Sequence, residues 1–305
     1  MQDGSRKAII AAFCANLGIA ISKFVGFLIT GSAGLLAEAG HSLADTGNQA
    51  LLMLGGKRAA QEPNRRHQFG YGAERYFWAF VVALVLFSGG GVFALYEGIQ
   101  KLLHPHKADS IGIAVAILLA AVALETFSLL TAVKEVKHVK PPDQSYWRFV
   151  RTAKHPELPI VLLEDVGAEI GLMFALFGLL MTRVTGNARW DAVGSVAIGV
   201  LLVAITIILA VRMKALLIGE SASAADQETI SDALATADRV ERVIHLRTVY
   251  LGPDELMVAA KLGFAADLTV GELAKAVDAA EAAVRARVPA VGLIYIEPDL
   301  YREVV

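Results

Sequence analysis

The sequence predicts a polytopic α-helical membrane protein with six transmembrane helices, followed by a small C-terminal α+β domain. Hydrophobic residues make up 55% of the 305 residues and charged residues only 19%. The mean hydropathy is +0.54, which is above the range that soluble domains usually have. Long apolar segments recur along the first two thirds of the chain, and abundant charge returns only after about residue 219.

Six segments are long and apolar enough to cross a bilayer as helices. A spanning helix needs about 20 predominantly apolar residues, and such segments cover residues 8–29, 33–56, 77–100, 110–133, 158–182 and 191–213. The second and fifth segments carry ionisable residues near their middle. Because such groups are costly in lipid, we expect these two helices to face a protein interior.

Basic residues concentrate in the connections on one side of these segments. The opposite connections hold only Lys101, Lys107, Arg183 and Arg189. The positive-inside rule therefore predicts that both termini are cytoplasmic. No transit peptide is recognisable, which favours an integral protein of a bacterial inner membrane.

The connection between the fourth and fifth segments has the composition of a membrane interface. Pro141-Pro142 ends a helix, and Tyr146, Trp147 and Phe149 alternate with basic residues. We therefore expect a connector that lies on the membrane surface.

The C-terminal part has the periodicities of a soluble α+β domain. We expect domain boundaries at 1–218 for the membrane domain and 219–305 for the second domain. The patterns predict a helix over 224–237, a strand over 240–250, a turn at Gly252-Pro253-Asp254, a strand over 255–264, a helix over 270–287 and a strand over 291–297. This αββαβ order predicts helices on one face of a three-stranded sheet.

Charge, cysteine content and motifs exclude several classes of function. A net charge of -2 and the absence of a basic arm argue against a nucleic-acid partner. The single cysteine, Cys14, excludes a disulfide framework and a cysteine-based zinc finger. No P-loop motif occurs, so an ATP-driven pump is not supported.

The second segment contains candidate metal ligands at helical spacing. His41 and Asp45 are four residues apart, which stacks them on one face of a helix, and Asn48 and Gln49 continue that face. Hydrocarbon offers no water, so a metal ion there needs negative or lone-pair ligands in place of its hydration shell.

The fifth segment places three carboxylates within six positions. Asp165 and Glu169 share a face, and Glu164 is rotated by about 100° from Asp165. Pairing with basic residues is the alternative interpretation, but no Lys or Arg lies in the middle of the second or fifth segment. An intramembrane cation site is therefore the favoured interpretation.

The chain resembles the cation diffusion facilitator family over nearly its whole length. The resemblance is carried by the six segments, the αββαβ tail and two motifs, His41-Ser42-x-x-Asp45 and Gly70-Tyr71-Gly72-x-Glu74-Arg75-Tyr76-Phe77-Trp78. Asp45-x-x-Asn48-Gln49 and Leu163-Glu164-Asp165 are similar to the branch that includes the mitochondrial zinc transporter. The resemblance implies a homodimer with a ferredoxin-like, metallochaperone-like cytoplasmic domain that exports divalent metal in exchange for protons.

Four ligand positions of the family fall on His41, Asp45, Val161 and Asp165. Valine cannot bind metal, so we expect Glu164 to be the fourth ligand, with Asn48 or a water as alternatives. Glu169 is a further candidate. A site with one nitrogen and mostly oxygen donors is harder than a two-histidine site, which keeps Mn²⁺, Fe²⁺ and Co²⁺ beside Zn²⁺ as candidate ions.

Two further metal sites of the family are only partly matched. In the connection after the second segment the positions are Asn64, His67 and Tyr71, of which only His67 is a good ligand. In the tail, His245 matches a ligand position, but Lys261 stands where a histidine is expected. His245 with Glu297 or Asp299 is therefore a candidate for one weakly held ion.

The resemblance implies zinc efflux, and we expect it to proceed by alternating access, with metal and protons competing for the same ligands. The alternatives are an intramembrane metal hydrolase, against which no His-Glu-x-x-His motif occurs, and a metal sensor that does not transport.

Overall fold

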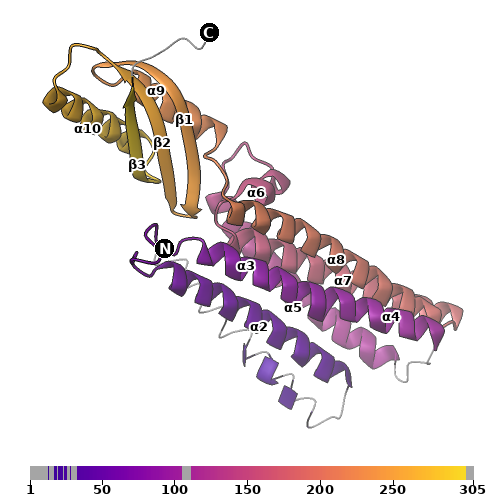
Figure 1. Cartoon of the computed structure of the whole chain (residues 1–305). Helices are drawn as coiled ribbons and strands as arrows, with labels where there is room; N and C mark the ends of the chain where they lie inside the picture. Colours follow the sequence, from indigo (N-terminus) through magenta and orange to yellow (C-terminus); the bar gives the residue numbers. More distant parts are fainter. Residues whose placement is uncertain are drawn as a thin grey trace. The chain divides into compact units, whose positions relative to one another are not determined.

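The structure is a computed structural model of the whole chain (Figure 1). It describes residues 33–104 and 111–299, together with isolated positions between 13 and 28. For residues 33–42, and at positions 111, 113, 114 and 117, it describes only the helical backbone. Most of the predicted first span, residues 8–29, and Cys14 therefore lie outside the described residues.

Long helices follow the predicted apolar segments from the second to the sixth. The third segment lies in one continuous helical stretch, Glu74–Leu103, in which a π-helical segment separates two α-helical ones. A short helix precedes the fifth segment, where an interfacial connector was predicted. The bounds are α2 (Ala33–Ala59), α3 (Glu74–Val85), the π-helix η1 (Leu86–Val92), α4 (Phe93–Leu103), α5 (Ile111–Val139), α6 (Tyr146–Thr152), α7 (Glu157–Thr185) and α8 (Arg189–Ile218).

Length and hydropathy alone qualify two of the described helical stretches as membrane spans. These are Glu74–Leu103 and Arg189–Ile218, which contain 18-residue windows with mean hydropathies of 2.2 and 2.7, respectively. The number of six spans stays a prediction.

Glycines allow the stretch from η1 to α4 to lie very close to α8. A β-carbon on Gly91 would come within 2.9 Å of Val203 Cγ2, and one on Gly98 within 2.8 Å of the Val196 backbone nitrogen. From the other side, a β-carbon on Gly199 would come within 2.7 Å of the Leu95 backbone nitrogen. Small residues at such contacts are typical of helix packing in membranes, where close van der Waals contact holds helices together.

Helix α5 packs along α7, and α6 closes one end of their contact. Val136 of α5, Phe149 and Val150 of α6 and Leu162 of α7 are buried there together. Ser145 caps α6 by accepting a hydrogen bond from the Arg148 backbone N–H at 3.2 Å. This packing places the α7 segment that carries Glu164 and Asp165 beside α5.

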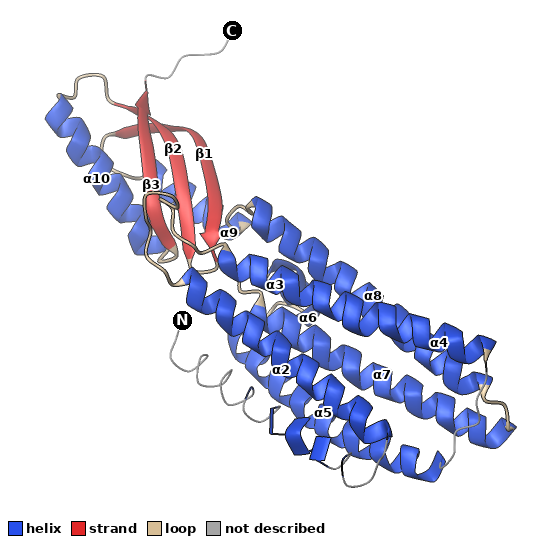
Figure 2. Ribbon diagram, turned by 60° about the horizontal axis from the view of Figure 1, so that its bottom comes forward, coloured by secondary structure: helices blue, strands red, loops and turns tan. Residues whose placement is uncertain are grey.

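The C-terminal elements form a three-stranded mixed sheet with its helices on one face (Figure 2). The strands run in the order β1-β2-β3; β1 pairs with β2 antiparallel, and β2 with β3 parallel. The bounds are α9 (Ala224–Ala235), β1 (Val240–Gly252), β2 (Glu255–Phe264), α10 (Val270–Arg287) and β3 (Val291–Asp299). This confirms the predicted αββαβ order. Strand β1 extends through Gly252, so that Pro253 and Asp254 alone make the turn.

Alternation along β2 decides which face of the sheet is buried. Val258, Ala260 and Leu262 pack with Ile230 of α9 and Val284 of α10 in one apolar core. Residues between them in sequence, including Lys261, point to the opposite face because successive strand side chains alternate. That helix-free face carries the candidate ligands of the tail.

The described residues separate into two compact units. One contains those up to Lys57 and Phe77–Met213, and the other contains Arg58–Tyr76 and the residues from Lys214 onward. In the second unit the connection before α3 contacts the β1–β2 turn. A β-carbon on Gly72 would lie 2.7 Å from Leu251 O, and Arg75 Nη1 lies 2.8 Å from Asp254 Oδ2.

Candidate cation site in the helical unit

Helix α2 places the candidate residues of the second segment on consecutive turns. It is continuous from Ala33 to Ala59, so His41 and Asp45 occupy positions one turn apart, as predicted. The described side chains begin after His41, whose side chain lies outside them. Asn48 is buried, with 1% of its surface exposed.

A hydrogen bond joins α2 to α7 at the predicted site. Asn48 Nδ2 donates to Glu164 Oε1 at 2.8 Å, across 116 positions of sequence. The neighbouring Asp165 is also buried. The structure therefore brings together the ionisable stretches of the second and fifth segments.

Helix α5 adds two hydroxyl groups to this site. Ser128 Oγ donates to Asp165 Oδ2 at 3.1 Å, and Thr126 Oγ1 donates to Glu169 Oε1 at 3.1 Å. Sequence reasoning missed both residues, because a lone Ser or Thr in an apolar helix commonly bonds its own backbone. The sequence offered one signal for them, because both lie within three residues of Glu125, an ionisable residue in the fourth apolar segment.

The carboxylates around Glu164 act on one another electrostatically. Asp45 and Asp165 both lie within electrostatic range of Glu164, and Glu125 lies within range of Asp165. The sequence has no Lys or Arg between residues 33 and 56 or between 158 and 182. Lys23, in the predicted first span, lies outside the described residues. Such a group of buried and half-buried acids favours the binding of protons or a cation for charge balance.

Buried acceptor oxygens without a partner lie on the same two helices. Among the described residues, Asn48 Oδ1, Gln49 Oε1 and Glu169 Oε2 have no hydrogen-bond donor. The orientation of the Asn48 amide follows from its donated bond to Glu164. Because buried polar atoms are nearly always satisfied, unpartnered acceptors favour a cation, a proton or water at this place.

The complete ligand set stays a prediction. The described side chains include no group of three or more His, Cys, Asp and Glu placed to hold a metal ion. The His41 side chain is not among them. Val161 stands where the family has another metal ligand. It packs against the apolar cluster of α5, α6 and α7, because its side chain is apolar.

The second candidate site brings its three positions together in the connection before α3. Asn64 Nδ2 donates to Tyr71 Oη at 2.6 Å, and the rings of His67 and Tyr71 have centroids 4.6 Å apart. Asn64 Oδ1 accepts from the backbone N–H of His67 at 3.0 Å. These contacts hold the three side chains close to one another.

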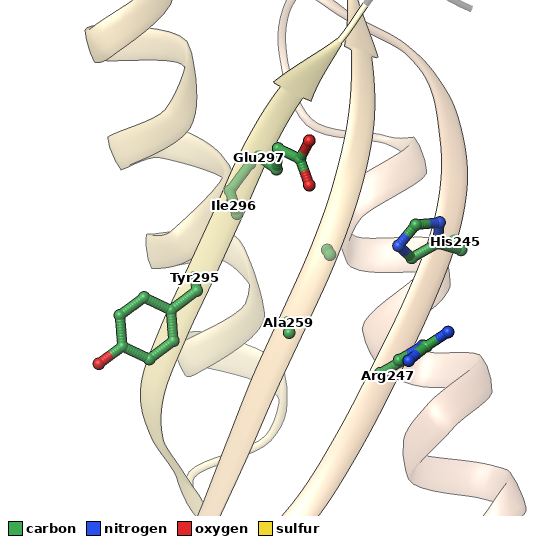
Figure 3. A pocket seen from close by; sticks show the side chains of 7 residues that line it. His245, Arg247, Ala259, Tyr295, Ile296 and Glu297 are labelled. Atoms are coloured by element: carbon green, nitrogen blue, oxygen red, sulfur yellow. The ribbon is translucent and has the colours of Figure 1, made fainter.

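The third candidate site lies on the helix-free face of the sheet (Figure 3). His245 of β1 pairs in register with Lys261 of β2, which pairs with Glu297 of β3. Lys261 Nζ lies 3.0 Å from Glu297 Oε1 and 2.7 Å from Asp299 Oδ2. A cavity of about 210 Å³ lies on this face between His245 and Glu297. The lysine ammonium thus pairs with both carboxylates that were predicted to bind an ion, and it offsets one of their two negative charges.

Carboxylates in the middle of packed, largely apolar helices are typical of integral membrane proteins that bind or transport ions. Comparison with known proteins identifies the family. The family model of the cation efflux transmembrane domain matches residues 9–218. The chain belongs to the cation efflux family, as its motifs predicted.

The most similar relatives include zinc transporters of the predicted branch. The chain is 30% identical over 262 residues to the human "Proton-coupled zinc antiporter SLC30A9, mitochondrial", covering 86% of this chain and 46% of that protein. It is 28% identical over 267 residues to "Metal tolerance protein C4" of Arabidopsis thaliana, which covers 87% of this chain and 58% of that protein. The chain thus spans about half the length of the curated relatives it matches.

Solved structures of the MamM C-terminal domain match the tail. For "MamM-CTD 215-293" the identity is 25% and the TM-score 0.24, with coverage of 25% of this chain and 96% of that chain. For a nickel form of a variant of the same domain, the identity is 24% and the TM-score 0.25. That match covers 26% of this chain and 100% of the MamM chain.

Proposed function

We propose that this protein exports a divalent metal cation, most favourably Zn²⁺, in exchange for protons by alternating access around the site between α2 and α7. The observation that carries the proposal is the acidic group of the buried Asp165 and the half-buried Asp45 and Glu164, with the unpartnered Asn48 Oδ1 beside it. A proton-coupled zinc antiporter among the relatives supports it. Mn²⁺, Fe²⁺ and Co²⁺ are alternative substrates, because oxygen donors suit them as well.

The ligands that we propose are His41, Asp45, Glu164 and Asp165. Asn48 donates a hydrogen bond to Glu164, and Ser128 donates one to Asp165. Metal binding requires deprotonated carboxylates and a neutral imidazole, so that protons arriving from one side displace metal loaded from the other. One set of buried groups thereby couples the two fluxes.

The remaining architecture of the proposal rests on the sequence. It comprises a membrane domain over 1–218 and a cytoplasmic domain over 219–305, with both termini in the cytoplasm and two copies in a homodimer. The asymmetry of basic residues supports this orientation. We place the protein in a bacterial inner membrane, although the most similar relatives include mitochondrial ones.

Transport in proteoliposomes tests the proposal. With an imposed pH gradient, we expect Asp45→Asn and Asp165→Asn to lower zinc flux by about tenfold or more, because each removes a ligand. Glu97→Gln is the matched control, since Glu97 is an exposed carboxylate that pairs with Lys101. Its flux should stay near that of the unaltered protein.

Two outcomes would contradict the proposal. Undiminished flux in both aspartate variants would show that Asp45 and Asp165 are not ligands of the transported ion. Metal binding without flux in the unaltered protein would favour the sensor alternative. Competition of Zn²⁺ flux by Mn²⁺, Fe²⁺ and Co²⁺ in the same vesicles identifies the preferred ion.

A further inference from the structure

Helix α6 has two distinct sides, although it is only seven residues long. Phe149 and Val150 are buried against α5 and α7, whereas Arg148 and Arg151 are exposed. Tyr146 and Trp147 are partly exposed, Trp147 to 51%. Aromatic rings with a polar edge gather at the boundary between hydrocarbon and water, so this helix has the composition of a segment at the membrane surface.

An apolar cavity, which is open rather than enclosed, is lined by residues of α5, α6 and α7. Its volume is about 260 Å³, and its lining includes Val133 of α5, Trp147 and Val150 of α6, and Leu163 and Val166 of α7. Water is a poor occupant of such a space, because it would need two to four polar partners. A hydrocarbon chain would satisfy the lining, and in a membrane the acyl chains of lipids are the hydrocarbon at hand.

Basic groups around α6 provide the charge for a headgroup. Neither the Arg148 nor the Arg151 guanidinium has an ion-pair partner among the described residues. The ammonium of Lys140 lies 5.4 Å from the centroid of the Tyr146 ring, close to one wall of the cavity. Clusters of Lys and Arg at a membrane surface attract anionic lipids.

We propose that an anionic phospholipid binds here, with one acyl chain in the cavity between α5, α6 and α7 and its headgroup at Arg148 and Arg151. Leu163 and Val166 line the cavity and immediately flank Glu164 and Asp165 in α7. The lipid chain therefore packs against the turn of α7 that carries the acidic residues. This site requires only that the protein is embedded in a membrane, and it does not depend on the transported ion.

Fluorescence quenching in lipid vesicles tests the proposal. The full chain has Trp78, Trp147 and Trp190, so that a variant with Trp78→Phe and Trp190→Phe keeps Trp147 as its single reporter. Phosphatidylglycerol with brominated acyl chains should quench Trp147 at least twofold more than equally brominated phosphatidylcholine at the same mole fraction. Trp190 alone, in a matched variant with Trp78→Phe and Trp147→Phe, should show no such preference.

Two substitutions separate the headgroup from the chain. Arg148→Gln with Arg151→Gln should reduce quenching by phosphatidylglycerol to the level of phosphatidylcholine, and Val166→Phe should reduce quenching by both lipids. Equal quenching by the two lipids in the unaltered background would overturn the proposal. So would equally strong quenching by a brominated uncharged detergent, which would leave only a non-specific apolar occupant.

A measurement without substitutions keeps the test decisive if a variant does not fold. In detergent micelles, phosphatidylglycerol should raise the Tm of the unaltered protein, and phosphatidylcholine at the same concentration should not. An equal effect of both lipids, or none, would contradict a bound anionic lipid.

Discussion

At β2 and β3, one ammonium group lies between two carboxylates. Lys261 pairs with both Glu297 and Asp299, and the hydrogen bonds to Asp299 and Glu297 raise its pKa above the ordinary value of 10.5. The charged lysine therefore stabilises the folded state. This stabilisation is fully present below pH 10.5 and is lost as the pH rises through the raised pKa of the folded protein. At neutral pH the lysine therefore occupies the place of a cation.

Replacing this lysine should uncover a weak metal site. In Lys261→Ala the carboxylates of Glu297 and Asp299 lose the Lys261 ammonium, and the cavity lined by His245 and Glu297 becomes open to Zn²⁺ or Co²⁺, which both kinds of side chain can bind. We expect calorimetry of the purified protein to show one additional bound ion per chain. The gain should disappear in Lys261→Ala with His245→Ala, and the exposed Lys275→Ala should show none. Unchanged binding in Lys261→Ala would contradict this interpretation.

A second effect of single residues concerns the start of α10. Thr269 accepts from the Glu272 backbone N–H, and the Glu272 carboxylate accepts from the backbone N–H and the hydroxyl of Thr269. This capping box lowers the pKa of Glu272 below its ordinary value of 4.5 through bonds from the Thr269 side chain and backbone. The carboxylate therefore stabilises the fold above pH 4.5, and this stabilisation is lost as the pH falls through its lowered pKa.

We expect Glu272→Gln to be less stable than the unaltered protein at pH 7 and equally stable well below pH 4.5. Denaturant unfolding of the tail at several pH values measures the difference. Thr269→Ala should cost about 1 kcal/mol of cap stability at pH 7. A stability difference between Glu272→Gln and the unaltered protein that does not change with pH would show that the Glu272 carboxylate does not stabilise the cap through its charge.

At the scale of elements, two glycine backbones join the connection before α3 to the β1–β2 turn. A β-carbon on Gly72 would meet Leu251 O at 2.7 Å and Gly252 Cα at 2.8 Å, and one on Gly252 would meet Gly72 Cα at 2.7 Å. Arg75 and Asp254 add an ion pair beside this contact. The neighbouring atoms belong to the backbone, so they cannot move aside by a change of rotamer.

We therefore expect Gly72→Ala to destabilise this unit by about 1–3 kcal/mol. Gly271→Ala is the matched control, because a β-carbon there has nothing within 4 Å and alanine favours helix α10, in whose first turn Gly271 lies. Thermal unfolding followed by circular dichroism measures both variants. Equal Tm values for Gly72→Ala and Gly271→Ala would show that the glycine contact is dispensable.

Across the whole molecule, the distribution of basic residues predicts the orientation in the membrane. Cysteine labelling of intact cells tests it in a Cys14→Ala background, which removes the single native thiol. A cysteine introduced at exposed Ser221 should react with an impermeant maleimide only after the membrane is opened. One introduced at exposed Asn187, between α7 and α8, should react in intact cells. The reverse pattern would overturn the positive-inside prediction.

The sequence by itself determined the elements and the family. Apolar length places α2, α5, α7 and α8, and period-two alternation and turn residues place β1 and β2, because these signals depend on residues near one another in the chain. The spacing of His41 and Asp45 is likewise local, since one helical turn separates them. The sequence also excluded Val161 as a ligand, because a valine side chain has no atom that can bind a metal ion.

Only the tertiary structure decided which groups meet. The bonds from Asn48 to Glu164 and from Ser128 to Asp165 join helices far apart in sequence, and no local pattern records which faces of two helices will pack together. The same holds for Lys261, whose partners on β3 depend on the parallel register of the sheet. Register and helix packing arise from burial across the whole fold, and for that reason spacing along the chain could not predict these contacts.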